Sequence, residues 1–259
     1  MKTSAAPPTE LLPERNKYAF EIAYDGGHFA GWQAQSNGRG VQDAIERALR
    51  ELGEGGTRVA GAGRTDAGVH ARAQVASAAL RKDWEPDRLL LALNFKLRPY
   101  ISIMKAERVS QDFHARRSAR SREYRYFIWN APSVYPHIAP YVYTLPIRGM
   151  DWARAAEAAK LMTGAHDFRA FCRKSDCPDK TERTVIKSRL VKKGNLVVYR
   201  VEANAFLTNM VRIMTSNLLE IAKGKRDEAW LAGLLSGEDR TRSAQTIPPE
   251  GLFLWRVTY

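Results

Sequence analysis

One glycine-rich stretch holds the residues with the clearest chemical potential: positions 61–70 read Gly-Ala-Gly-Arg-Thr-Asp-Ala-Gly-Val-His. A dinucleotide-binding fingerprint would need glycine where Asp66 stands, and this carboxylate would repel a pyrophosphate. A phosphate-binding P-loop would need Lys and then Ser or Thr after Gly68, but Val69 and His70 follow. Both nucleotide motifs are therefore excluded. Asp66 is either a functional carboxylate or a turn residue that only bonds nearby backbone amides.

Metal chemistry has little support in the sequence. The two cysteines, Cys172 and Cys177, have a Cys-x4-Cys spacing that is a poor zinc signal without a second pair. The five histidines are scattered, and none stands in a spacing typical of metal ligands. We therefore expect no metal.

The charge balance indicates a polyanionic partner. Forty-one Lys and Arg stand against 28 Asp and Glu, which leaves a formal net charge of +13 and a pI of about 9.9. Such an excess creates a positive surface potential, for which nucleic acid is the most common partner. A basic protein that is merely soluble is the alternative, and charge alone does not decide.

Two basic stretches could contact phosphates. The segment 173–193 has eight basic residues, and five arginines fall within ten residues, interleaved with aromatic side chains: Arg116, Arg117, Arg120, Arg122 and Arg125. Taken alone, such runs are usually solvated faces. If these residues contact RNA, the affinity for RNA should fall steeply as the salt concentration rises.

The ends and the hydropathy of the chain suggest its location. No run approaches the ~18 apolar residues of a membrane-spanning helix. The first fifteen residues include three prolines and two glutamates and lack the apolar region of a signal peptide. We expect a short disordered tail over 1–16, a cytoplasmic location and no membrane association.

Strands and helices are predicted on both sides of the glycine-rich stretch. Apolar residues alternate over 17–24, which indicates a strand, and Asp25-Gly26-Gly27 ends it in a turn. Apolar residues recur at helical spacing from Val41 to Leu52, and Gly53 closes that helix. The remaining elements predicted in this region are strands over 57–61, 75–80 and 124–129 and a helix starting near Pro86.

The second part of the chain repeats this mixture. A helix is predicted from an N-cap at Asp151 to Met162, and Lys192-Lys193-Gly194-Asn195 indicates a hairpin. Apolar residues from Leu207 to Ile221 follow the spacing of a long amphipathic helix. The other predicted elements are the hairpin strands 184–191 and 196–203, a helix over 227–235 and a final strand over 252–259.

These elements predict an antiparallel α+β fold rather than a doubly wound parallel sheet, because hairpins and helices are mixed without strict alternation. The stretch 131–149 holds four prolines and little periodicity, so we interpret it as a connecting segment. It would separate an N-terminal domain, 17–130, which carries Asp66, from a C-terminal domain, 150–259.

Residues 63–70 resemble the signature of TruA-type tRNA pseudouridine synthases. Further matches stand in the family's order and spacing across about residues 18–259: Tyr24-Asp25-Gly26, Phe29, Gly31-Trp32-Gln33, Gln35, Val41-Gln42, Asp112-Phe113-His114-Ala115-Arg116, Tyr124-Arg125-Tyr126, Asn204-Ala205-Phe206-Leu207, Met210-Val211-Arg212 and Glu250-Gly251-Leu252. Thr208 and Asn209 stand where the family varies. Departures from the family pattern at Arg98-Pro99 and Ser216 concern a loop and helix packing.

The resemblance implies an enzyme that isomerises uridine to pseudouridine without a cofactor, at positions 38, 39 and 40 in the anticodon stem-loop of tRNA. It implies Asp66 as the nucleophile and Arg212 as its ionic partner. Tyr124 would pack against the target base, and Arg64 would fill the gap that the flipped base leaves.

The resemblance also implies an architecture and a partner. Two α+β halves would have antiparallel sheets joined side by side, with helices packed on one side and a central active-site cleft. A homodimer would hold tRNA across both subunits. With this resemblance, RNA contact becomes the favoured interpretation of the basic residues Arg116, Arg117, Arg120 and Arg122.

A single carboxylate suits isomerisation better than hydrolysis. Retaining glycosidases pair their nucleophile with a second carboxyl, which protonates the leaving group and activates water. An isomerase must instead keep its leaving group and exclude water, so one aspartate can serve as the nucleophile. Attack on the anomeric carbon and attack on the uracil ring both stay open. The alternatives for the whole chain are a non-catalytic RNA-binding module and a synthase that acts on another RNA.

Overall fold

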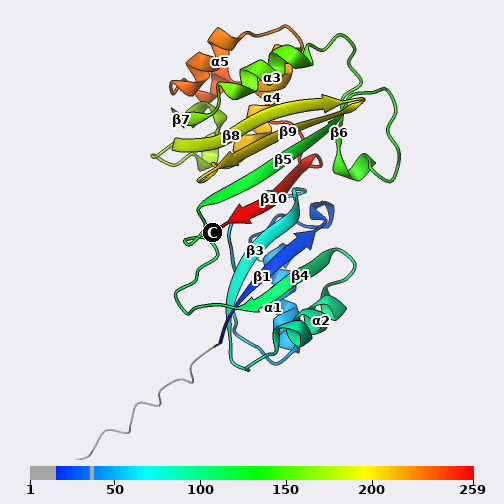
Figure 1. Cartoon of the computed structure of the whole chain (residues 1–259), viewed down its shortest axis with the longest axis vertical. Helices are drawn as coiled ribbons and strands as arrows, with labels where there is room; N and C mark the ends of the chain where they lie inside the picture. Colours follow the sequence, from blue (N-terminus) through cyan, green and yellow to red (C-terminus); the bar gives the residue numbers. More distant parts are fainter. Residues whose placement is uncertain (1–15, 36–37) are drawn as a thin grey trace, which may run out of the picture.

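The computed structural model describes residues 16–35 and 38–259, so residues 1–15 of the predicted tail lie outside the described part and Asn16 already begins a strand. The described strands form a single sheet (Figure 1). Across the sheet they are β4 (Ile101–Arg108), β1 (Asn16–Tyr24), β3 (His70–Leu80), β10 (Leu252–Thr258), β5 (Ser121–Trp129), β9 (Leu196–Ala203), β8 (Glu182–Lys193) and β7 (Gly164–Asp167). Two short strands pair at its sides, β2 (Ala60–Gly61) with β3 and β6 (Tyr143–Thr144) with β5.

Ten helical segments accompany the described strands. The α-helices are α1 (Val41–Glu51), α2 (Pro86–Leu97), α3 (Trp152–Lys160), α4 (Met210–Ala222) and α5 (Glu228–Leu235). The 3-10 helices are η1 (Gly26–His28), η2 (Ala139–Tyr141), η3 (Arg169–Phe171), η4 (Lys174–Asp176) and η5 (Arg240–Arg242).

In the first half, helices α1 and α2 pack on the antiparallel strands β4, β1 and β3. Alternate residues of β1, among them Phe20 and Ile22, are fully buried. Ile45 and Leu49 of α1 and Leu93 of α2 belong to the same core. The predicted alternation of β1 and the helical spacing of α1 are thus the two faces of one hydrophobic layer.

In the second half, a hairpin and a buried helix form the core. Strands β8 and β9 meet at Gly194 and Asn195 as predicted, and Gly194 has the positive φ (57°) that such a two-residue turn requires. Helix α3 begins after Asp151, whose carboxylate accepts the N–H of Arg154 at 2.9 Å, so this predicted N-cap is confirmed. Helix α4 packs against α3 with most of its residues buried.

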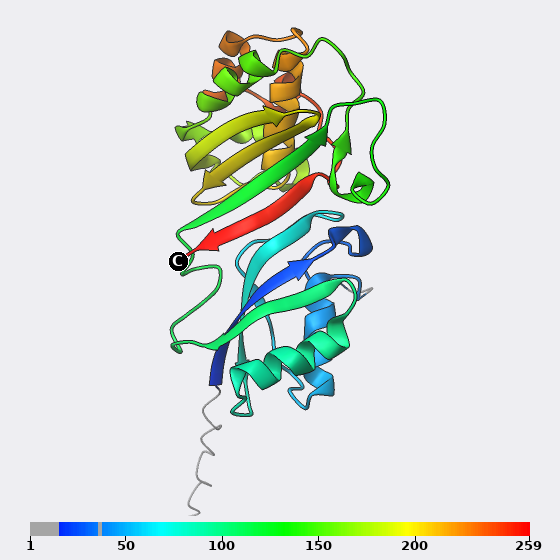
Figure 2. The same cartoon turned by 45° about the vertical axis from the view of Figure 1, so that its right-hand side comes forward.

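Strand β10 joins the two halves. It runs antiparallel to β5 and parallel to β3, where Phe253 lies opposite His70 and Leu254 opposite Ala71. Figure 2 shows it in red between the cyan β3 and the green β5. The predicted fold class is confirmed: α+β, with two antiparallel sheets joined side by side and helices packed on one side. The pairing of β10 with β3, here called the seam, is parallel, as is the short pairing of β6 with β5, whereas the other described strand pairs are antiparallel.

Several boundaries differ from those predicted. Strand β3 begins at His70 rather than at residue 75, and strand β4 was not predicted. The predicted strand 57–61 shortens to the two residues of β2. The division into 17–130, 131–149 and 150–259 stays a prediction, and β5, the last strand of the first segment, pairs with β9 of the third.

The seam offers a stability test. Leu254 is fully buried in β10, so Leu254→Ala would remove apolar contacts from the junction and leave a cavity. We expect the free energy of unfolding to fall by about 2–5 kcal/mol, measured by urea denaturation. The exposed Thr258 of the same strand supplies the control, because Thr258→Ala should change stability by less than about 0.5 kcal/mol. Equal stabilities of the two variants would contradict a packed seam.

Candidate active site

A cleft of about 370 Å³ opens where the two halves meet. The loop 61–69, here called the Asp66 loop, forms one wall through its residues 62–66 and Val69, and residues 205–211 form another. Of the predicted site residues, those that line the cleft are Arg64, Asp66, Arg116, Arg122 and Tyr124. Arg212 completes the set from α4 through its contact with Asp66.

Buried polar side chains fix the Asp66 loop to the sheet. Gln74 of β3 is fully buried, and its amide donates to the carbonyl of Gly63 at 2.7 Å and accepts the N–H of the same residue at 3.3 Å. The Tyr24 hydroxyl lies 2.8 Å from Oγ1 of Thr65, directly before Asp66. Because the loop is bonded on both sides of Arg64, the position of the Asp66 backbone is defined by β1 and β3.

A second segment, 29–32, packs against the same loop. The N–H of Trp32 donates to the carbonyl of Thr65 at 3.0 Å. Gly31 has a φ of 100°, and a Cβ there would lie 2.6 Å from that carbonyl oxygen. Glycine is therefore required at position 31 both by its backbone conformation and by the close approach of the Asp66 loop.

Asp66 and Arg212 approach each other from opposite halves of the molecule. Nη1 of Arg212 lies 3.5 Å from Oδ2 of Asp66, and the side chains are 15% and 33% exposed, respectively. Two neutral oxygens hold the guanidinium: Nε donates to the carbonyl of Ile247 and Nη1 to Oδ1 of Asn209, both at 2.8 Å. The ionic partnership implied by the sequence resemblance is therefore present in the geometry.

The cleft changes the acidity of Asp66. Burial raises the pKa of its carboxyl, and the Arg212 guanidinium opposes that rise by charge and by hydrogen bonding. Among the weaker influences, Arg173 lowers this pKa and Asp176 raises it. The carboxylate form therefore depends on the nearby guanidinium more than an exposed aspartate would.

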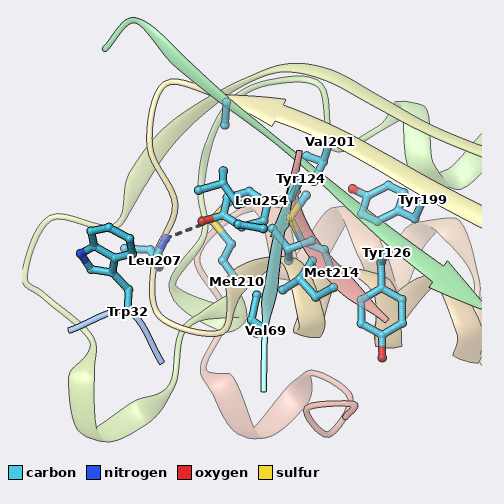
Figure 3. Close-up of a cluster of buried hydrophobic side chains, with 14 of the residues drawn as sticks. Trp32, Val69, Tyr124, Tyr126, Tyr199, Val201, Leu207, Met210, Met214 and Leu254 are labelled. Atoms are coloured by element: carbon cyan, nitrogen blue, oxygen red, sulfur yellow. Dashed lines mark hydrogen bonds between the residues drawn. The ribbon is translucent and has the colours of Figure 1, made fainter. Parts of the chain in front are cut away.

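Tyr124 supplies an aromatic wall. Its side chain lies in β5 and is 7% exposed, and its ring meets Phe206 edge to face with centroids 5.0 Å apart. Figure 3 shows it within a buried cluster that includes Val69, Leu207 and Met210. Burial raises the pKa of its phenol, so the hydroxyl stays protonated. Such a wall can contact an unstacked base.

The other predicted arginines differ in their exposure. Arg64, Arg116, Arg117 and Arg120 are exposed, and the first two line the cleft. Arg116, Arg117 and Arg120 are therefore accessible to a polyanion, and their contact with RNA stays a prediction, as does the role of Arg64 in filling the gap left by a flipped base.

Arg122 has a different environment from the one predicted. It is 8% exposed, and its guanidinium donates to the carbonyl oxygens of Ala62, Arg116, Ala119 and Asn204. The charge run suggested a phosphate contact, but its strand places this side chain inside, where backbone oxygens occupy its donors. It links the start of the Asp66 loop to the segment after β9.

Sequence reasoning missed the residues that support the site. Gln74 gave one usable signal, a long polar side chain in a strand otherwise rich in alanine. The roles of Tyr24, Thr65 and Asn209 depend on contacts between segments far apart in the sequence, which no local pattern reveals.

Neither a metal site nor a membrane span is found in the described part of the chain. No group of three or more His, Cys, Asp or Glu residues there could hold a metal ion, and both cysteines are free. The helices described are too short or too polar to cross a bilayer.

The comparison with family models identifies the family. The model described as tRNA pseudouridine synthase matches residues 21–116 and 158–259, which include the Asp66 loop and α4. The chain belongs to the tRNA pseudouridine synthase family. The resemblance seen in the central motif is thereby confirmed, and the enzyme is an isomerase that forms pseudouridine in tRNA. Tyr124 lies in the part of the chain outside the two matched segments.

Relatives named tRNA pseudouridine synthase A are similar along most of the chain. The protein of Geobacillus kaustophilus is 40% identical over 243 residues, which cover 92% of each chain. That of Methylocella silvestris is 41% identical over 245 residues, which cover 94% of this chain and 98% of its own. Among solved structures, a Cbf5-Nop10-Gar1 complex aligns with a TM-score of 0.37 and 13% identity over 78% of this chain and 44% of that chain, a similarity too low to bear on the site.

The buried environment of Arg122 leads to a testable difference among the arginines. Arg122→Met would leave buried carbonyl oxygens without donors, so we expect the free energy of unfolding to fall by about 3 kcal/mol. Arg117→Met, at an exposed position, should change it by less than about 0.5 kcal/mol. Urea denaturation of both variants measures this difference, and an Arg122→Met variant as stable as the wild type would show that the bonds contribute nothing.

Proposed function

We propose that this synthase isomerises uridine to pseudouridine at positions 38, 39 and 40 of the anticodon stem-loop of tRNA, with Asp66 as its nucleophile. The target positions rest on the resemblance of the motif 63–70 and its companions to TruA-type enzymes. The observation that carries the nucleophile is the placement of Asp66 in the cleft, within 3.5 Å of the Arg212 guanidinium and beside the Tyr124 wall.

The reaction needs one nucleophile and no net change of atoms. The carboxylate attacks the target nucleotide, at the anomeric carbon or at the uracil ring, and the bond from N1 to the sugar breaks. The base rotates and a bond forms from C5 to the sugar; the bond to Asp66 breaks and frees the carboxylate, the C5 proton is lost and N1 gains a proton. The described cleft offers one carboxylate, Asp66, at its wall, which fits a reaction that retains its leaving group and excludes water.

The neighbouring side chains have complementary roles in this proposal. Arg212 favours the ionised nucleophile, and Tyr124 packs against the extruded base. Arg64, exposed at the cleft two residues before Asp66, fills the gap that the base leaves in the stem.

The tRNA body would contact the exposed basic rim. Arg116, Arg117 and Arg120 are exposed on the segment that leads into β5, and the net charge of +13 favours a polyanion. Arg122 is not part of this surface, because its donors are bonded to carbonyl oxygens. The proposed cytoplasmic location rests on the hydropathy of the sequence, and the proposed homodimer rests on the resemblance alone.

Asp66→Asn tests the nucleophile. The amide has nearly the same shape but cannot attack, so release of tritium from C5 of labelled uridine in a tRNA transcript should stop. The affinity for tRNA should stay within about threefold, since an amide leaves the phosphate contacts in place. Asp87→Asn, the same change at an exposed position of α2, is the control and should turn over normally.

The outcomes separate the alternatives. Binding of tRNA by the wild type without any release of label would favour a non-catalytic binding module. Release from other transcripts alone would favour a different RNA substrate. An Asp66→Asn variant with normal turnover would exclude Asp66 as the nucleophile.

The pH dependence tests the role of Arg212. The active form is the carboxylate, so kcat/KM is lost as the pH falls through the pKa of Asp66, which burial has raised. Arg212→Gln removes the charge that opposes this rise, and the acid limb should therefore move to higher pH. Arg212→Lys should restore part of the profile. An unchanged acid limb in Arg212→Gln would mean that the guanidinium does not control the nucleophile.

A further inference from the structure

Asn209 has an unusual backbone conformation directly before helix α4. Its φ is 63° and its ψ is 3°, and among the described residues it is the only non-glycine residue with a positive φ. Asparagine tolerates this left-handed conformation better than most residues, yet the conformation still disfavours the folded state relative to glycine. Because Asn209 also lines the cleft, the strain is located at the proposed active site.

The ordinary explanation for asparagine at this position does not apply. An asparagine before a helix usually caps it by accepting a backbone N–H of the first turn. The Asn209 side chain makes no such capping bond, although its backbone carbonyl accepts the N–H of Ile213 at 3.0 Å. Its side-chain amide oxygen is instead bonded to Arg212.

This bond sets the orientation of the guanidinium. Oδ1 of Asn209 accepts from Nη1 of Arg212 at 2.8 Å, and the carbonyl of Ile247 accepts from Nε at 2.8 Å. A planar guanidinium held at two nitrogens has a defined plane and direction. The same Nη1 lies 3.5 Å from Oδ2 of Asp66, so the Asn209 amide holds the nitrogen that faces the carboxylate.

The Asn209 amide carries no charge, and the attraction between Arg212 and Asp66 depends on this. A carboxylate at position 209 would lie nearer to Nη1 than Asp66 does and would compete for the same positive charge. An amide oxygen accepts the hydrogen bond without neutralising the guanidinium, whose attraction for Asp66 is retained.

We propose that Asn209 is a positioning residue of this synthase, whose amide oxygen aims the Arg212 guanidinium at Asp66. The inference rests on the proposed function of Asp66 as the nucleophile and deepens it. Besides Arg212, the charged groups that act on Asp66 are Arg173 and Asp176 from the segment of η4. Tyr124 of β5 also faces Asp66, whose charge raises the pKa of its phenol. In the described structure Asn209 is instead bonded to Arg212.

Substitution by glycine separates the side chain from the backbone. Asn209→Gly keeps the positive φ without strain but removes the amide. We expect the single-turnover rate of label release from the tRNA transcript to fall about tenfold or more, with tRNA affinity within about twofold and an unreduced melting temperature. The acid limb of the pH profile should move to higher pH, as in Arg212→Gln, because the misplaced guanidinium no longer opposes the protonation of Asp66.

Two further variants test the route of the effect. Asn209→Asp should lose more activity than Asn209→Gly, because its carboxylate competes for Arg212. On an Arg212→Gln background, Asn209→Gly should cause no further loss, since residues that act through one another are not additive. A wild-type rate and pH profile in Asn209→Gly, or losses that multiply in the double variant, would overturn the proposal.

The two levels of the hypothesis fail in different experiments. Normal turnover by Asp66→Asn would show that Asp66 is not the nucleophile, and the proposed function would be wrong in that respect. An inactive Asp66→Asn beside a fully active Asn209→Gly would leave the proposed function in place and remove only the positioning role.

Discussion

The proposed chemistry of this synthase depends on one electrostatic balance, the ionisation of Asp66 inside a cleft. Burial favours the protonated acid, and the Arg212 guanidinium at 3.5 Å favours the carboxylate. Neither group could create this balance alone, because one lies on a loop before β3 and the other on α4. The proposed reaction therefore requires the two halves to be placed as the fold places them.

Sheet pairing and a buried arginine are among the contacts that maintain this placement. Strand β10 pairs in parallel with β3 over Phe253 and Leu254 and runs antiparallel to β5 on its other side. Arg122 adds a second link, since its guanidinium donates both to Ala62, at the start of the Asp66 loop, and to Asn204, after β9. Sheet pairing holds the two halves together, and the buried Arg122 joins the two walls of the cleft.

Local signals in the sequence predicted much of the fold, whereas the site required the tertiary structure. Helix α1, the cap at Asp151 and the turn at Gly194 follow from side-chain spacing and backbone preference. The start of β3 was missed because Ala71 and its neighbours have weak strand propensity. That the two sheets join side by side was expected from the resemblance alone, because the pairing of β10 with β3 connects segments far apart in the chain. Of the central residues, Asp66 and its partner could be named only through the resemblance.

Two of the four arginines at the cleft, Arg122 and Arg212, suggest why it can attract an anion. Arg212 is bonded to a carbonyl and an amide, and Arg122 to carbonyls alone, so neither is neutralised by its anchors. By contrast, the buried carboxylate of Glu123 in β5 forms ion pairs with three arginines. Neutral oxygens can orient a guanidinium as a carboxylate can, but they do not offset its positive charge. That charge therefore still attracts an anion that enters the cleft. The neutral anchors thus leave the positive charges of Arg122 and Arg212 available beside the Asp66 loop, where carboxylate anchors would offset them.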